Sequence, residues 1–327
     1  MAAWQAAPPR RLGVVCNRRS GRCRRHLERI RRQAAACAAL DYREVEDLDG
    51  IHAALGDFVA ARVEAIAVVG GDGTLQATLT ALLTGHDLTA ETLPALIAIA
   101  GGTTNMSARS LGARLAPWAA LEQLVAWCEG RGEGPRQVPH PVVRVAPGTA
   151  PVQYGLFFGA GAITAGVAYF HARLQSRLAS AWGPRLAFVR MLWSILRGKP
   201  HPLLPPTPCR LEFDDGTRQE GAYQIVAIST LDRLMMGARP FWGAQPGALR
   251  LAAMARDAAA PWRWLPLVLC GYGQRVAPRA QGYFSRNLGA LTLICESDFI
   301  IDGERFTAGC GRPLRITASR PLPFHVL

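Results

Sequence analysis

The sequence predicts a mixed α/β fold of two domains, an N-terminal three-layer α/β domain followed by a β-rich, sandwich-like domain. Three observations indicate this. Short apolar runs alternate with segments of helical periodicity in the first third of the chain, which is typical of βαβ units. Closely spaced strand patterns dominate after Gly130. Finally, 327 residues are enough for two domains that each bury a core.

The first domain is expected to alternate strands and helices. Expected strands cover residues 12–15, 42–45, 66–69 and 96–100. Expected helices are residues 21–40, a helix capped by Asp49, a helix striped by Leu75, Leu79, Leu82 and Leu83, and a helix that begins at Pro117. Parallel strands joined in this way place all their following turns at one edge of the sheet.

Residues 131–141 are rich in Gly, Pro and polar side chains and predict the crossing between the domains. The first domain is therefore expected to span residues 1–135 and the β-rich domain residues 136–298. Strands are expected at 142–145, 154–158, 210–213, 223–229, 249–254 and 291–295, interrupted by a basic helical stretch over 170–197.

Composition excludes several classes of protein. Half of the residues are apolar and 19% are charged, which excludes a disordered chain. The eight cysteines form no C-x-x-C pair, so we expect reduced thiols in a cytoplasmic protein and no zinc site. The N-terminus has no apolar signal segment, and residues 152–171 carry too many glycines for a membrane span.

The strongest chemical signal is the turn Gly70-Gly71-Asp72-Gly73-Thr74, between an apolar strand and a helix. Glycines allow a phosphate to approach the backbone, the start of a helix offers N–H groups, and the aspartate is suited to Mg²⁺. The letters match neither the P-loop nor the dinucleotide fingerprint. A tight turn without ligand is the alternative interpretation.

A second turn of the same type, Gly101-Gly102-Thr103-Thr104-Asn105, follows the next strand. On a parallel sheet both turns lie at the carboxyl edge, where ligands bind. Thr103 and Asn105 offer a hydroxyl and an amide for phosphate or base contacts, although capping of the helix explains them equally well. Two such turns on neighbouring strands predict a nucleotide site.

Taken together, these two turns resemble the catalytic domain of the diacylglycerol kinase family, which includes sphingosine and ceramide kinases and is related in fold to NAD kinases. Asn17-Arg18-Arg19-Ser20-Gly21 is similar to the family's N-P-x-S-G, Asp302-Gly303-Glu304 matches its D-G-E, and residues 183–188 are similar to its G-P-x-A-Y. The resemblance implies that residues 299–327 return to the first domain.

The resemblance also implies roles. It makes the chain an ATP- and Mg²⁺-dependent lipid kinase, with Glu304 as the general base and Asp72 as catalytic residue and metal ligand. It implies a nucleotide site formed by Asn17, Gly70, Gly71, Asp72, Gly73, Thr74, Leu75, Gln76, Gly102, Thr103 and Asn105. Asp302-Gly303 also has the pattern of a β-hairpin turn, as does Asp215-Gly216, which is followed by Thr217 instead of a glutamate.

Three positions depart from the family pattern: Met106 follows Asn105 where Asp is frequent, Thr164 stands near an expected Asp, and Pro246 replaces the Asp of an Asp-Gly pair. Two alternatives therefore remain open. One is a kinase of NAD or of another soluble hydroxyl compound. The other is a non-catalytic nucleotide- or lipid-binding regulator of the same fold.

The net charge of +13 predicts an anionic partner. Eight arginines crowd residues 18–32, and the stretch 170–197 alternates arginines with an apolar stripe. We expect a cytoplasmic protein in peripheral contact with an anionic membrane that holds its lipid substrate. Nucleic acid is not an expected partner, because no nucleic-acid-binding motif accompanies the charge. No feature indicates an oligomeric state.

Overall fold

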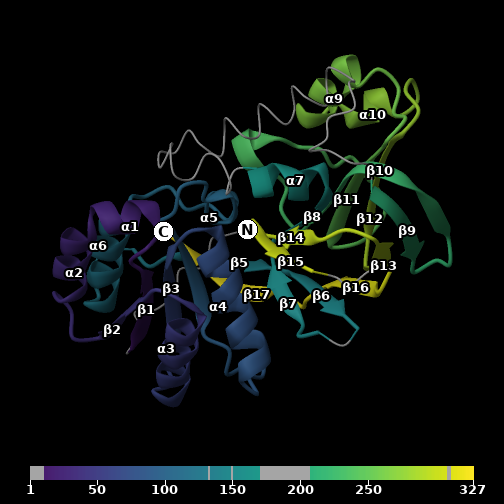
Figure 1. Cartoon of the computed structure of the whole chain (residues 1–327). Coiled ribbons are helices and arrows are strands. Elements are labelled where there is room, and N and C mark those ends of the chain that lie inside the picture. The colour runs from purple at the N-terminus through teal and green to yellow at the C-terminus, as the bar shows by residue number, and fades with distance from the viewer. Residues whose placement is uncertain (1–10, 132, 149, 170–206, 308–310) are drawn as a thin grey trace. The chain divides into compact units, whose positions relative to one another are not determined.

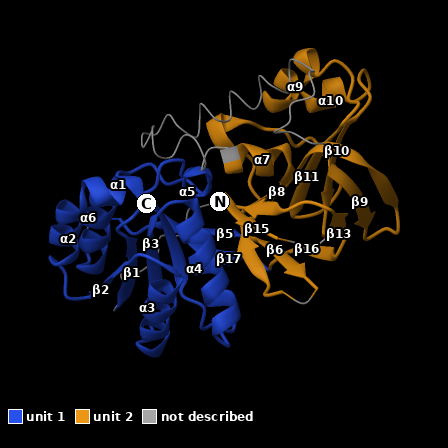
Figure 2. Cartoon of the chain, in the orientation of Figure 1, with its two compact units in different colours: residues 1–140, 320–327 blue, residues 141–319 orange. Residues whose placement is uncertain are grey.

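The computed structural model describes residues 11–131, 133–148, 150–169, 207–307 and 311–327. The chain divides into two compact units, residues 1–140 with 320–327, and residues 141–319 (Figure 2). The domain boundaries expected at 135 and 298 do not coincide with the ends of these units and stay a prediction. The basic stretch 170–197 and the segment 183–188 lie outside the described residues.

The first unit contains a sheet of order β2-β1-β3-β4-β17-β5 (Figure 1). Its parallel part consists of β1 (Leu12–Asn17), β2 (Leu40–Val45), β3 (Ala65–Gly70) and β4 (Ala95–Ala100). The end of the chain then adds β17 (Leu322–Val326) parallel to β4, and β5 (Arg136–His140) pairs antiparallel with β17. Of the segment 299–327, residues 322–326 thus belong to this sheet.

Helices cover both faces of this sheet, which makes the three layers expected from the sequence. On one face, α2 (Leu27–Ala34) and α6 (Pro117–Cys128) pack on alternate residues of β1, β3 and β4. The opposite face carries α3 (Leu48–Ala60), whose Phe58 fills the space above Gly13, and α4 (Asp72–Gly85) packs beside α3. The all-buried β3 is apolar along its whole length because helices cover it on both sides.

Two local predictions in this unit are wrong. Residues 21–40 do not form one helix: α1 (Gly21–Arg25) and α2 are separated by His26, whose φ of −127° leaves the helical region. The N-cap of α3 is Asp47, whose carboxylate accepts a hydrogen bond from the backbone N–H of Gly50 at 2.9 Å, and Asp49 lies in the first turn. Both residues suit a helix start, and spacing alone did not distinguish them.

The second unit is built on an antiparallel sheet whose main path runs β15-β14-β8-β10-β9-β13-β16-β6-β7, with β11 and β12 continuing from β10. Its strands are β6 (Val143–Pro147), β7 (Gln153–Gly155), β8 (Phe157–Gly161), β9 (Thr207–Phe213), β10 (Arg218–Ser229), β11 (Leu249–Ala255), β12 (Tyr283–Leu288), β13 (Ala290–Cys295), β14 (Phe299–Ile301), β15 (Glu304–Phe306) and β16 (Pro313–Ala318). The sequence did not predict β12 and β16.

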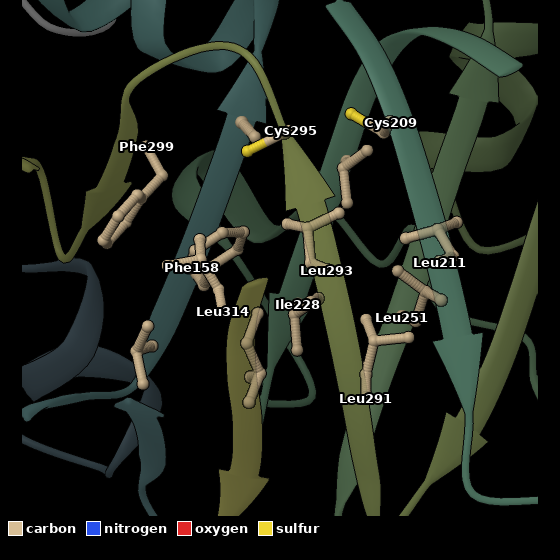
Figure 3. Packing of buried hydrophobic residues seen from close by; sticks show 14 of the residues in the cluster. Phe158, Cys209, Leu211, Ile228, Leu251, Leu291, Leu293, Cys295, Phe299 and Leu314 are labelled. Atoms are coloured by element: carbon tan, nitrogen blue, oxygen red, sulfur yellow. The ribbon is translucent and has the colours of Figure 1, made fainter. Parts of the chain in front are cut away.

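The core of the second unit lies between side chains that alternate along these strands. Phe158, Ile228, Leu293 and Phe299 are among its fully buried members, and their side chains point toward one another from four strands in Figure 3. The rings of Phe158 and Phe299 stack with centroids 5.2 Å apart. This apolar layer fixes β14, and with it the hairpin that carries Glu304.

The described residues of the second unit also form three α-helices. A separate apolar cluster joins α7 (Ala162–Tyr169), α9 (Pro261–Leu269) and α10 (Gly273–Val276) to β11 and β12. In Figure 1, α9 and α10 lie side by side beyond these strands. In the part of the chain that the structure describes, no helix has both the length and the hydropathy needed to span a membrane.

Candidate functional site

Three strand-to-helix turns meet at the carboxyl edge of the sheet in the first unit, because β1, β3 and β4 are neighbours in the strand order. The first turn connects β1 to α1, the second connects β3 to α4, and the third connects β4 to α5 (Met106–Ser110). This is the edge at which open parallel sheets bind their ligands. The structure therefore brings together both glycine-rich turns and the Asn17 turn.

The two glycine pairs touch through their backbones. The N–H of Gly101 donates to the carbonyl of Gly70 at 2.8 Å, and a Cβ at Gly102 would lie 2.4 Å from the Cα of Gly71. A Cβ at Gly101 would lie 2.5 Å from the sulfur of Cys23. Gly101 and Gly102 must be glycine because other atoms approach them so closely, and not because of an unusual φ. The two glycine pairs thus form one tightly packed surface, which we call the floor of the site.

Asp72 joins the second turn to the third. Its carboxylate accepts hydrogen bonds from the backbone N–H of Met106 at 3.0 Å and of Ser107 at 2.8 Å, and so caps the start of α5. Burial raises the pKa of this carboxyl group, although the two N–H donors act in the opposite direction. Asp72 thus links the two turns structurally and is also a candidate catalytic residue and metal ligand.

Asn105 closes the third turn on itself. Its side-chain oxygen accepts from the N–H of Gly102 at 2.7 Å, and its amide donates to the carbonyl of Gly102 at 2.8 Å. The residue is 1% exposed and adopts a left-handed conformation with φ 52°, which asparagine tolerates better than most residues. Both ends of the amide are used within the turn, and the Asn105 side chain makes no capping hydrogen bond to α5, although the residue stands at the N-cap position.

Asn17 ties the first turn to α4. Its amide donates to the hydroxyl of Thr74 at 2.9 Å, and its side-chain oxygen accepts from the N–H of Arg19 at 2.9 Å. Thr74 in turn lies against Gly70, where a Cβ would come within 2.6 Å of it. Leu75 and Gln76 are buried in α4 at 3% and 4% exposure, and the Gln76 amide donates to Thr80.

The partly exposed residues of the three turns are therefore the ones that can meet a ligand. These are Asn17 and Ser20 in the first turn, Gly71, Asp72 and Gly73 in the second, and Thr103 and Thr104 in the third. The hydroxyl of Thr103 faces Gly21 at the start of α1, where a Cβ would lie 3.2 Å from it. Backbone N–H groups at the start of the 14-residue α4 and these hydroxyls form an environment suited to phosphate oxygens.

The side chains of this site can bind Mg²⁺ only together with the phosphate groups of a ligand. Asp72 supplies one carboxylate, each of whose oxygens keeps a lone pair beyond the N–H that it accepts. Mg²⁺ is commonly held by one or two carboxylates together with substrate phosphates. The described residues contain no cluster of three or more acidic, His or Cys side chains that would hold a metal by themselves.

Glu304 belongs to the second unit and begins β15, directly after a two-residue hairpin turn. Ile301 pairs with Glu304 across the hairpin, and Asp302 and Gly303 have φ values of 48° and 92°, as a type I′ turn requires. The carboxylate of Asp302 accepts from the N–H groups of Leu156 and Phe157 at 2.8 and 3.0 Å, which anchors the turn to β8. The Glu304 side chain is exposed.

The hairpin at Asp215-Gly216 differs in the exposure of its aspartate and in the groups that the aspartate bonds. Asp215 is exposed and accepts from the hydroxyl and N–H of Thr217 at 2.6 and 3.0 Å. These bonds, together with Arg286, hold the pKa of Asp215 below its ordinary value. Only the hairpin of Glu304 has its aspartate buried at 4% exposure and bonded to a neighbouring strand. The anchored turn holds the backbone of Glu304 in place.

Comparisons with known proteins give a family match over part of the first unit and similar folds among solved structures. The diacylglycerol kinase catalytic domain family matches residues 11–130. Two structures of a proposed diacylglycerol kinase from Bacillus anthracis str. Sterne superpose with TM-scores of 0.65 and 0.66 at 16% and 17% identity. Both cover 98% of this chain, and 98% and 99% of their own.

The structure of yeast NADH kinase complexed with NADH has a TM-score of 0.50 at 8% identity, over 98% of this chain and 84% of that one. A comparison with curated proteins gives no match. At these identities the solved structures show a shared fold.

Proposed function

Because residues 11–130 form a domain of the diacylglycerol kinase catalytic family, we propose that this protein is an ATP-dependent lipid kinase, which transfers the γ-phosphoryl group of ATP to the hydroxyl of diacylglycerol or a sphingosine-like lipid. The observation that supports this most is the floor of two glycine pairs in backbone contact, which leads into the start of α4. The close packing of the two turns holds the third turn, with Thr103, against the start of α4, whose backbone N–H groups suit phosphate oxygens.

In the proposed site, the N–H groups at the start of α4 and the hydroxyl of Thr103 bind the phosphates of ATP, and Asp72 holds α5 against α4. Mg²⁺ bound to Asp72 and the phosphates would neutralise phosphate charge. Phosphoryl transfer needs mainly positioning and charge stabilisation from the protein, which is what these groups supply.

We assign the general base to Glu304. In the step, the lipid hydroxyl oxygen forms a bond to the γ-phosphorus while the bond from that phosphorus to the β-phosphate oxygen breaks, ADP leaves, and the Glu304 carboxylate accepts the hydroxyl proton. The support for this assignment is the anchored turn, which keeps the backbone of the glutamate fixed, together with the exposure of its side chain to solvent.

Transfer of radiolabelled phosphate from [γ-³²P]ATP tests the proposal, with diacylglycerol, sphingosine, ceramide and NAD offered separately in mixed micelles or buffer. We expect labelled product from a lipid acceptor. Label only in NAD would favour the kinase of a soluble compound. Nucleotide binding without any labelled product would favour the non-catalytic regulator.

The proposed kinase acts in peripheral contact with an anionic membrane from the cytoplasmic side. The arginines of α1 and α2 that support this contact include Arg24, Arg25, Arg29 and Arg32, all of which are exposed. Arg31 is held in the protein by Glu28 and Glu44.

A further inference from the structure

Exposed hydrophobic side chains gather on one part of the second unit. Among the described residues, five large hydrophobic side chains are exposed, and four of them lie between positions 236 and 272. They are Met236 (60%), Trp262 (66%), Leu267 (39%) and Tyr272 (48%). Single exposed hydrophobic residues are common on soluble proteins, but a group of four is a sign of an interaction surface.

Backbone hydrogen bonds join these residues into one surface, which we call the α9 face. The N–H of Arg239 donates to the carbonyl of Leu269 at 2.8 Å, which ties the loop of Met236 to the end of α9. Tyr272 donates its N–H to Leu267 at 2.9 Å, so the link to α10 folds back on the helix. The α9 face therefore comprises α9, the start of α10 and the loop of residues 235–239.

Helix α9 has apolar residues on both sides. Leu265 and Val268 are buried in the cluster with α10 and β11, whereas Trp262 and Leu267 point away from it into solvent. In its nine residues, PWRWLPLVL, Arg263 is the sole polar side chain. A helix that is hydrophobic all round belongs in an apolar environment on every side, and the described structure provides one only on the inner side.

The segment that forms the α9 face is rich in positive charge. Residues 231–282 contain seven arginines and two aspartates, and one of the aspartates, Asp232, pairs with Arg250. Two guanidinium groups lie over aromatic rings of the face: Arg263 at 4.5 Å from the ring centre of Trp264, and Arg275 at 5.3 Å from that of Tyr272. This arrangement covers ring surface while keeping the charge available to anions.

We propose that the α9 face docks on the surface of an anionic lipid bilayer, with Trp262 and Leu267 inserted at the level of the headgroups and Arg263 and Arg275 bound to lipid phosphates. Tryptophan and tyrosine favour this interface, and basic apolar helices lie in its plane. A symmetric contact between two copies would oppose arginine to arginine and is disfavoured by that repulsion. The proposal rests on the proposed lipid kinase, to which it assigns a route to the substrate.

Sedimentation of the full-length protein with vesicles tests the α9 face. On phosphatidylcholine vesicles that contain phosphatidylglycerol, we expect Trp262→Gln to weaken binding by about tenfold or more, since burying a large apolar side chain contributes roughly 1.5–3 kcal/mol. Arg263→Gln should weaken binding to these anionic vesicles by about fivefold, since one surface arginine contributes about 1 kcal/mol on anionic lipid. On vesicles of pure phosphatidylcholine, Arg263→Gln should bind as the wild type does.

Leu48→Gln is the matched control, because Leu48, at the start of α3 in the other unit, is 60% exposed, close to the 66% of Trp262. It should bind vesicles as the wild type does. Brominated lipids should quench the wild-type tryptophan fluorescence more than that of Trp262→Phe. Equal binding by Trp262→Gln and Leu48→Gln would overturn the proposal, and so would concentration-dependent self-association that Trp262→Gln abolishes.

A water-soluble short-chain diacylglycerol separates this proposal from the kinase function. Trp262→Gln should phosphorylate the soluble acceptor at the wild-type rate and the vesicle-bound acceptor more slowly. If the wild type phosphorylates neither acceptor but still needs Trp262 to bind vesicles, the α9 face stands and the kinase proposal fails. If the vesicle rate is unaffected by Trp262→Gln, the α9 face fails and the kinase stands.

Discussion

Replacement of Asp72 by alanine should lower the free energy of unfolding far more than loss of an ordinary helix cap. Its carboxylate accepts two backbone hydrogen bonds, at 2.8 and 3.0 Å, from Ser107 and Met106. Without the carboxylate these two N–H groups lose their acceptor, which costs roughly 1–3 kcal/mol for each group. We therefore expect Asp72→Ala to destabilise the first unit by about 2–4 kcal/mol.

Asp47→Ala provides the comparison. Asp47 is also an N-cap, but it is exposed, and its carboxylate accepts a hydrogen bond from the N–H of Gly50 at 2.9 Å. Its loss should cost about 1 kcal/mol, the usual value for a cap. Urea unfolding followed by tryptophan fluorescence measures both variants. If Asp72→Ala lost no more stability than Asp47→Ala, Asp72 would not be the link between the two turns that the structure indicates.

The pH dependence of stability in the wild type and in Asp72→Asn tests the electrostatics of Asp72. Burial raises the pKa of Asp72 in the folded state, so the folded protein binds this proton more tightly than the unfolded chain. The contribution of Asp72 to stability is therefore greatest at low pH and falls as the pH rises from the ordinary aspartate value of about 4 to the folded value. The stability difference between wild type and the non-titrating Asp72→Asn should shrink over that range, and a difference that grows would mean a lowered pKa.

Three further predictions concern the turns and the cysteines. Gly102→Ala should abolish ATP binding in isothermal titration, because its Cβ would lie 2.4 Å from the Cα of Gly71, whereas Gly85→Ala, with open space around it, should bind ATP normally. Glu304→Gln should lower kcat by a factor of about 10² to 10⁴ with little change in ATP affinity. Thr217→Ala, at the residue after the other Asp-Gly turn, should retain the wild-type kcat. If Glu304→Gln kept more than about a tenth of the wild-type kcat, Glu304 would not be the general base. Burial raises the pKa of Cys128 to about 12, so at pH 8 iodoacetamide should alkylate the exposed Cys270 long before Cys128, as peptide mass spectrometry would show.

Local patterns predicted the βαβ part of the first unit because each of its signals is short in sequence. The apolar run of β3, the glycine pair after it and the stripe of α4 all lie within about twenty residues. The hairpin at Asp302-Gly303 was predictable for the same reason, and its φ values confirm the turn. Asn105 shows the limit, because its two hydrogen bonds to Gly102 depend on a left-handed conformation that the letters do not reveal.

Strands β5 and β17 were not predictable from such patterns. Pro139 and Pro323 lie opposite each other in the antiparallel pair, and proline within a short run argues against a strand because it lacks an N–H donor. The pairing also joins residues nearly two hundred positions apart, which local periodicity does not encode. The hydrogen bonds from α5 to Asp72 were not predictable either, because their donors are backbone N–H groups, which every residue except proline has. The identity of Met106 therefore does not indicate that its N–H bonds Asp72.

The position of β17 has a consequence for how the protein is made. This strand pairs with β4 on one side and with β5 on the other, so the sheet of the first unit stays divided until residues 322–326 leave the ribosome. During translation the nascent chain presents an unpaired, apolar edge at β4 while the whole second unit is synthesised. We therefore expect the nascent chain to need chaperones until β17 is made, and we expect products that stop before residue 322 to keep the unpaired edge of β4. This holds although the glycine turns are complete within the first 110 residues.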